Sequence, residues 1–281
     1  MSIQRFKPEI WSARLLVALR KTLVYAGPQI VNRDYEGEIS AAGDTVRITS
    51  IGRPTISNYV PGSTSINPEQ LTDAQRTLVV DQSKYFAFEV DDVDARQAKG
   101  NVLPQAADES AYGLADVIDQ YVASFYTGVS TANQLGTVSI TTGDIAYNTL
   151  VDLSVKLDEA NVPTEGRYVV IPPWYHGLLR KNTNFINAEK SADGGAALRN
   201  GQIGEAAGFA VLKSNNCPLV TGDDYAVTAG TNAAISFAEQ INKTEAYRPQ
   251  DSFSDAIKGL TLYGAKLVRP DNLATVIASK S

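Results

Sequence analysis

Three carboxylates within four residues are the clearest candidates for chemistry in this sequence. The segment KYFAFEVDDVDARQAK, residues 84–99, places Asp91, Asp92 and Asp94 directly after an aromatic run. Clustered carboxylates can hold a cation or move a proton, but this spacing lacks the glycine and the closing glutamate of an EF-hand loop. At a helix start, all three would lie in the positive first turn. We interpret them as a strand end followed by a helix N-cap, with a cation site and contacts with a neighbouring chain as alternatives.

The other reactive side chains form no recognisable catalytic pattern. His176, in PPWYHGLL, is the single histidine, and one histidine cannot build a multi-histidine metal site. Cys217 is the single cysteine, so an intrachain disulfide is excluded. The sequence contains no G-x-S-x-G, no P-loop and no G-x-G-x-x-G motif. We predict no enzymatic activity, no cofactor and no metal, and structural roles for His176 and Cys217.

The composition is that of an ordinary globular chain with an uneven charge. Of 281 residues, 43% are hydrophobic and 20% are charged, which allows a sizeable core. The net charge of −6 argues against nucleic-acid binding over the whole surface of the protein. Residues 1–33 nonetheless hold six basic residues and one acidic residue, a local charge of +5 that leaves −11 for the rest. We infer a basic arm that docks on something negative, with a helix bearing solvated arginines as the alternative.

Two elements in the first third of the chain are predicted to project. Residues 7–25 have the pattern of an amphipathic helix, with Trp11 and Leu15 on its apolar face. Residues 37–90 contain two alternating runs, GDTVRITSIG and TLVVDQSKYFAFEV, joined by a long polar connection. This pattern predicts a long β-hairpin, which cannot bury a core of its own and must lie on something else. No apolar run approaches the ~20 residues needed to span a bilayer, so no membrane partner is expected.

A long helix is predicted over residues 105–127. Apolar side chains recur there at three- and four-residue spacing, Pro104 precedes them, and Asp108 and Glu109 are expected in the first turn. At ~1.5 Å per residue the helix would be about 35 Å long, enough for the spine of an elongated molecule. The rest of the chain predicts a mixed α+β fold, with a helix at 145–160, strands in RYVVI, GFAVLKSN and AAISFAE, and two closing strands around Pro270.

Each projecting piece has too little core of its own, which favours a protein stabilised by neighbouring copies in a lattice. Five stretches spread over most of the chain carry a resemblance to a known family. They are, in order, VNRDYEGEISAAGDTVRI, KYFAFEVDDVDARQA, AADESAYGLADVIDQYVASF, RYVVIPPWYHGLLRK and GFAVLKSNNCP. Through them the chain resembles the major capsid proteins of tailed bacteriophages with the HK97-type fold, particularly the branch that includes the P22 coat protein.

The resemblance implies an HK97-like α+β capsid fold. Its parts would be an N-terminal arm at 1–35, an extended loop across the next subunit at 36–84, a peripheral domain at 85–165 with 105–127 as its spine helix, an axial domain at 166–254, and closing strands of the peripheral domain at 255–281. It also implies pentamers and hexamers that close into an icosahedral shell around double-stranded DNA. Such a virion would be assembled in the host cytoplasm.

The resemblance further implies which residues meet partners. Contacts between subunits are expected at Trp11, Leu15, Arg53, Tyr59, Asp91, Asp92 and Asp94. Residues facing the shell interior, towards DNA or scaffold, are expected to be Arg5, Lys7, Arg14, Arg20 and Lys21. Because the arm helix follows Met1 almost directly, we expect a separate scaffolding protein, besides a portal protein, and leave a decoration protein open. Lys84 lies only at the base of the extended loop, so no lysine–asparagine crosslink is expected.

Two other functions remain as alternatives. An encapsulin, a bacterial compartment of the same fold, would hold a cargo enzyme in place of DNA. An enzyme that depends on a metal or on carboxylates would use Asp91, Asp92 and Asp94, and would lose activity in Asp92→Ala with its folding intact.

Overall fold

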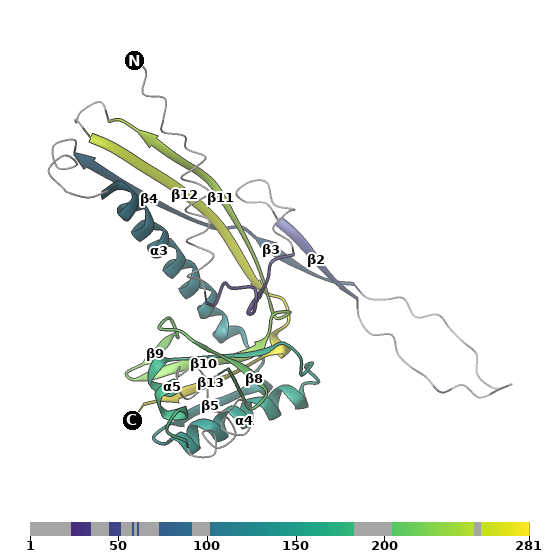
Figure 1. The fold of residues 1–281 in the computed structure, drawn as a ribbon. Coiled ribbons are helices and arrows are strands. Elements are labelled where there is room, and N and C mark those ends of the chain that lie inside the picture. Colours follow the sequence, from purple (N-terminus) through teal and green to yellow (C-terminus); the bar gives the residue numbers. More distant parts are fainter. Residues whose placement is uncertain are drawn as a thin grey trace.

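In the computed structural model, the described part of the chain forms an elongated body, a compact body and a projecting hairpin (Figure 1). A four-stranded sheet and a long helix make the elongated body, a seven-stranded sheet makes the compact body, and a two-stranded sheet makes the hairpin. Among the described helices, none has the length and hydropathy that a membrane crossing requires. The described residues are 24–34, 45–51, 58, 61, 73–91, 102–182, 204–249 and 254–280.

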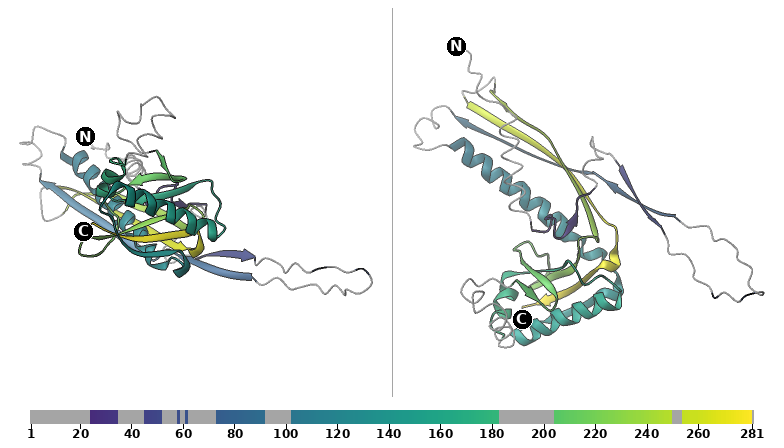
Figure 2. Two further views of the ribbon diagram at one scale, coloured as in Figure 1. Left: turned by 90° about the horizontal axis from the view of Figure 1, so that it is seen from below. Right: turned by 45° about the vertical axis from the view of Figure 1, so that its right-hand side comes forward.

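The elongated body is built on the sheet β1-β11-β12-β4. Its strands are β1 (Val31–Asn32), β11 (Ile235–Tyr247), β12 (Ser254–Leu267) and β4 (Gln82–Asp91). β12 is antiparallel to both of its neighbours, and the short β1 runs parallel to β11. Helix α3 (Val102–Ala123) lies along one side of this sheet and continues as the 3-10 helix η2 (Ser124–Gly128) (Figures 1 and 2).

The compact body is built on the sheet β5-β13-β10-β6-β8-β7, with β9 also paired to β10. Its strands are β5 (Gln134–Ser139), β6 (Arg167–Ile171), β7 (Glu205–Ala206), β8 (Phe209–Lys213), β9 (Leu219–Thr221), β10 (Asp224–Thr231) and β13 (Leu273–Ser279). Its helices are α4 (Gly143–Glu159) and α5 (Pro173–Leu179), with the short 3-10 helices η3 (Thr131–Asn133) and η4 (Pro270–Asn272).

Local sequence explains the elements of the compact body. Every residue of β6 is buried, as the apolar run from Tyr168 to Ile171 predicts for a central strand, and the buried Arg167 at its start forms an ion pair with Asp158 at 2.7 Å. Helix α4 begins after Thr142, whose hydroxyl accepts a hydrogen bond from the Ile145 N–H. Its apolar stripe, including Leu150 and Leu153, is fully buried against the sheet. These features confirm the predicted strand at RYVVI and the predicted helix at 145–160.

The hairpin consists of β2 (Thr45–Ile51) and β3 (Asp73–Val79). The two strands are antiparallel, from the pair Thr45–Val79 to the pair Ile51–Asp73. They leave the elongated body to one side in all views (Figures 1 and 2). The predicted projecting hairpin is therefore confirmed, although the run expected as a single strand is interrupted at Val80 and Asp81, where β3 passes into β4.

The long helix is confirmed with a correction at its start. It begins at Val102, so Pro104 lies inside the first turn and does not precede the helix. The first turn holds no acidic residue, because Asp108 and Glu109 fall beyond it. A proline is tolerated there because the first N–H groups of a helix have no intrahelical partner.

The sheets divide the chain at residues different from the expected boundaries. β11 falls within the range expected for the axial domain, 166–254, but lies in the four-stranded sheet. β5 and α4, expected with the spine helix in 85–165, belong to the compact body, as does β13 from the range 255–281. The reason is that the chain crosses between the bodies after η2, after β10 and after β12. Strand partners are chosen by long-range pairing, which local periodicity does not reveal.

Candidate functional site

The carboxylate cluster is divided by the structure. Asp91 is the last residue of β4 and pairs with Ser254 of β12, which confirms the predicted strand end. Asp92 and Asp94 lie outside the described residues, as does the helix cap predicted there. Within the described ranges, no group of three side chains of the metal-binding types is arranged to hold an ion.

His176 and Cys217 both lie in surroundings that disfavour their charged forms. Burial, then the charges of Lys213 and Arg180, lower the pKa of His176 on α5. Burial raises the pKa of the Cys217 thiol to about 12, so the thiol stays protonated at neutral pH. A protonated thiol is a poor nucleophile, and Cys217 acts as a packing residue in the core that also contains Tyr25.

A buried aspartate on α3 connects three distant segments. Asp119 is 3% exposed, and its Oδ1 accepts hydrogen bonds from the backbone N–H groups of Val24 at 2.9 Å and Tyr25 at 2.6 Å. Its Oδ2 accepts a bond from the Asn216 amide at 3.0 Å. Burial raises the pKa of Asp119, while the donors of Asn216, Tyr25 and Val24 offset part of that rise. The carboxylate therefore fixes the segment that starts at residue 24 to the spine helix and to the loop after β8.

Residues 24–34 are also held near their C-terminal end, by Arg33. Arg33 donates to the Ala26 carbonyl through Nε at 3.2 Å and Nη2 at 2.7 Å, and its Nη1 lies 3.6 Å from Glu239 Oε2 on β11. Its guanidinium also stacks 4.9 Å from the centre of the Phe237 ring. Together with the pairing of β1 to β11, these contacts set where the chain enters the fold from residues 1–23.

The same segment fills the junction between the two bodies. Ile30 and Val31 are buried in a cluster that combines residues of α3, such as Ile118, with Tyr168 of β6 and Tyr263 of β12. The Tyr25 hydroxyl lies 3.4 Å from Cys217 Sγ in this cluster. One continuous core thus spans the spine helix and both sheets.

The base of the hairpin rests on β12. Leu78 and Val80 are buried together with Leu262 and Ala238, in a small cluster separate from the main cores. Arg76 Nη1 donates to the Leu267 carbonyl at 3.2 Å. The hairpin is therefore anchored where β3 passes over the end of β12.

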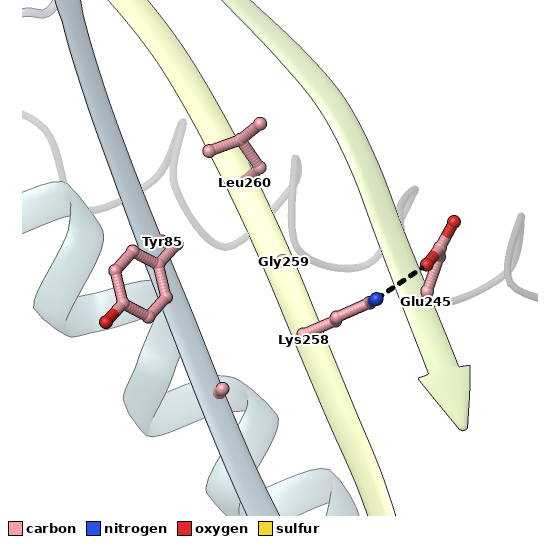
Figure 3. A pocket seen from close by; sticks show the side chains of 6 residues that line it. Tyr85, Glu245, Lys258, Gly259 and Leu260 are labelled. Carbon is pink, nitrogen blue, oxygen red and sulfur yellow. Dashed lines mark ion pairs between the residues drawn. The ribbon is translucent and has the colours of Figure 1, made fainter. Parts of the chain in front are cut away.

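A shallow hollow of about 480 Å³ lies on the same sheet, farther along β4 and β12. Its lining residues are Tyr85, Ala87, Glu245, Lys258, Gly259 and Leu260 (Figure 3). Tyr85 is 79% exposed, and Lys258 forms a 3.1 Å ion pair with Glu245. Helix α3 runs behind the strands in this view, so the hollow opens on the side of the sheet away from the helix (Figure 3). Exposed apolar surface of this kind is typical of an interaction face.

The remaining predicted contact residues lie outside the described part of the chain. They are Arg5, Lys7, Trp11, Arg14, Leu15, Arg20, Lys21, Arg53, Tyr59, Asp92 and Asp94. Sequence reasoning missed Asp119, although a signal existed. Asp119 is four residues after Ala115 and three before Val122, so it shares the apolar face of the predicted helix. A lone carboxylate on such a face requires buried partners.

Comparison with known proteins places this arrangement among shell-forming proteins. A chain from Mycobacterium phage Che8 is 32% identical with a TM-score of 0.76, and the match covers 90% of each chain. A chain in the capsid structure of the Cyanophage P-SCSP1u is 21% identical, with a TM-score of 0.71 over 86% of this chain and 85% of that one. A chain in a virus-like particle from Pyrococcus furiosus is 14% identical, with a TM-score of 0.57 over 95% and 98%. No curated protein sequence matches this chain significantly.

The α+β architecture is the HK97-like capsid fold predicted from the sequence. Residues 74–276 match the family of phage capsid proteins, and this chain belongs to that family. It is a major capsid shell protein of a bacteriophage, with its place in the virion capsid. This membership does not favour the encapsulin alternative or the alternative of an enzyme that uses the three aspartates.

Proposed function

We propose that this chain assembles as pentamers and hexamers into an icosahedral shell around double-stranded DNA, with the hairpin of one copy lying across the next. The main support for this proposal is the way the hairpin is attached to the rest of the chain. Its described contacts with the rest of the chain gather at its base, around Leu78 and Val80. A two-stranded hairpin is marginally stable by itself in water, so a partner surface would stabilise the projecting strands. In a closed symmetric assembly, a neighbouring copy supplies that surface.

The two bodies would take the two roles that the resemblance implies. The four-stranded sheet with α3 would be the peripheral domain, and the seven-stranded sheet would be the axial domain near the five- and six-fold centres. This assignment moves β11 to the peripheral domain and moves β5, α4 and β13 to the axial domain. Its support is that each group of elements shares one sheet.

The N-terminal arm would face the shell interior. Its basic residues, Arg5, Lys7, Arg14, Arg20 and Lys21, would meet DNA or a separate scaffolding protein, and Trp11 and Leu15 would pack on a neighbouring copy. The local charge of +5 on an otherwise acidic chain supports this orientation. Asp119 and Arg33 hold residues 24–34 in the defined place from which the arm departs.

The role would be structural and non-catalytic, with assembly in the host cytoplasm and a portal protein at one vertex. Family membership supports the structural role, and the protonated state of the buried Cys217 thiol agrees with it. Arg53, Tyr59, Asp91, Asp92 and Asp94 would lie at contacts between subunits. A decoration protein is left open.

Electron microscopy of the protein co-expressed with its scaffolding protein, backed by sedimentation velocity, tests this proposal. We expect uniform closed shells with five- and six-fold units, and DNA inside particles produced during infection. A chain that stays monomeric with the scaffold present would contradict the shell role. Closed shells that hold a cargo enzyme in place of DNA would support an encapsulin.

A further inference from the structure

We propose that Gly264 and Arg76 are positioning residues that set the angle at which the hairpin β2–β3 leaves the four-stranded sheet. The inference rests on the proposed function of the hairpin as a contact between copies. It goes beyond that function because it names the residues that fix the direction of the hairpin.

Gly264 lies in β12, at the point where the chain between β3 and β4 passes over it. A Cβ atom at this position would overlap the Val79 carbonyl oxygen and would stand 2.8 Å from Val80 Cα and 3.0 Å from the Val79 carbonyl carbon. All of these are backbone atoms, which cannot rotate away as the end of a flexible side chain can. The close approach of the two strands therefore requires glycine at position 264.

The second contact that fixes β3 on β12 is a hydrogen bond from Arg76. Arg76 donates from Nη1 to the Leu267 carbonyl at 3.2 Å, three residues beyond Gly264 along β12. Leu78 lies between these places and Val80 lies at the second one, and both side chains are buried in the cluster with Leu262. β3 is thus fixed at two places, by the hydrogen bond of Arg76 and by the backbone contact at Gly264. Two fixed places define the direction of a strand.

A small change at one of these places tilts the whole of β3. The two places are about 10 Å apart along β3, since a strand rises about 3.4 Å per residue. Ordinary carbon–carbon contacts lie at about 3.5–4.0 Å, so a methyl group at position 264 would lift the backbone by about 1 Å. With Arg76 still bound as the pivot, this lift tilts β3 and moves its far end, about 10 Å beyond Arg76, by about 1 Å in the opposite direction. A shift of that size would misplace the hairpin on a neighbouring copy.

Gly259 provides a matched control on the same strand. A Cβ atom there would overlap the ring of Phe86, the residue that faces it across the β12–β4 ladder. The conflict is with a side chain of the sheet and does not touch β3. Gly259→Ala should therefore lower stability and leave the direction of the hairpin unchanged. Gly113→Ala on α3, where a Cβ meets nothing within 4 Å, serves as the neutral control.

The first test measures the angle in the unassembled full-length chain. Cysteines that carry spin labels replace Asp73, at the far end of β3, and the exposed Asn148 on α4. The distance between the two labels is measured by double electron–electron resonance spectroscopy. We expect the mean distance to shift by about 1 Å in Gly264→Ala. We expect no shift in Gly259→Ala or Gly113→Ala. An unchanged distance in Gly264→Ala would overturn the proposal.

The second test examines the assembled product. Under conditions in which the wild-type chain and its scaffolding protein form closed shells, we expect Gly264→Ala to give at least tenfold fewer closed shells, or shells of altered size. Gly113→Ala, at which a Cβ meets nothing within 4 Å, should give wild-type shells. Normal shells from Gly264→Ala would refute the positioning role, whereas failure of the wild-type chain to form shells would refute the proposed function itself.

A second variant keeps the test decisive if Gly264→Ala does not fold. Arg76→Met keeps the apolar stem and removes the bond to the Leu267 carbonyl, so one fixed place of β3 is lost. We expect a broader distance distribution between the labels and a mixture of particle sizes, with the melting temperature close to that of the wild-type chain. A distribution as narrow as that of the wild-type chain would overturn the proposed role of Arg76.

Discussion

The carboxylate of Asp119 accepts a 2.6 Å hydrogen bond from the backbone N–H of Tyr25, across 94 residues of sequence. Through this bond and its neighbours, one side chain of the spine helix determines where the chain from residues 1–23 joins the fold. The same carboxylate binds Asn216 in the loop after β8. Asp119 is therefore the polar centre of the junction at which the arm segment, the spine helix and the compact body meet.

Removal of this carboxylate should destabilise the subunit strongly. Asp119→Ala would leave the buried N–H groups of Val24 and Tyr25 without an acceptor, and we expect the free energy of unfolding to fall by about 3 kcal/mol. Asp119→Asn keeps one acceptor oxygen and should cost less. Asp116→Ala, one turn away at a partly exposed position, should stay within about 0.5 kcal/mol of the wild-type value. Urea denaturation of the dissociated subunit measures all three, and equal losses for Asp116→Ala and Asp119→Ala would contradict this role.

The buried carboxylate also predicts a pH dependence. Because burial raises the pKa of Asp119 in the folded state, the folded chain binds this proton more readily than the unfolded chain does. The stability linked to this group is therefore fully present below its unfolded pKa and is lost as pH rises through its folded pKa. The free energy of unfolding of the wild-type chain, relative to Asp119→Asn, should rise as pH falls from 7 towards 3.8, the ordinary pKa of an aspartate side chain. A difference that stays constant or falls over this range would contradict a raised pKa.

Cys217 should resist chemical modification in the folded chain. Burial raises the pKa of its thiol to about 12, and the thiolate is the reactive species. At pH 8 we expect a maleimide or a disulfide reagent to modify Cys217 only as fast as the chain unfolds, and to modify it readily in urea. Thr221→Cys, at an exposed position on nearby β9, should react in the folded chain. Rapid modification of Cys217 at pH 8 would show that the junction opens without unfolding.

The spine helix offers an adjacent pair of positions with opposite environments. Ile118 is fully buried in the core at the junction, whereas Val117 is 39% exposed. Ile118→Asp should abolish folding, because an unpaired buried charge costs several kcal/mol out of a total stability of about 5–15 kcal/mol. Val117→Asp should be tolerated. Circular dichroism and the yield of folded protein compare the two, and equal behaviour would contradict the observed orientation of α3.

Local patterns of the sequence were sufficient for the elements themselves. The spacing of apolar residues predicted α3 to within a few residues, and alternation predicted β4 and the hairpin. The fold class followed from the order of these elements together with the resemblance. The start of α3 was placed too late because Pro104 was taken as a boundary, although a helix tolerates proline in its first turn.

The assignment of strands to bodies could not be predicted in this way. β11 and β13 have apolar patterns that fit any buried sheet, and their partners are decided by long-range pairing. The same limit applies to the polar junction, since Asp119 binds groups 94 to 97 residues away. Gly264 was missed for a related reason, because only the crossing of β3 over β12 shows what a side chain there would meet.

A cryo-electron microscopy map of the assembled particle would show directly whether the hairpin of one copy lies across the next in a closed shell. We expect β2 and β3 of each copy to contact the elongated body of a neighbouring copy within pentamers and hexamers. A closed shell in which every hairpin folds back on its own chain, or projects without contact, would contradict this arrangement.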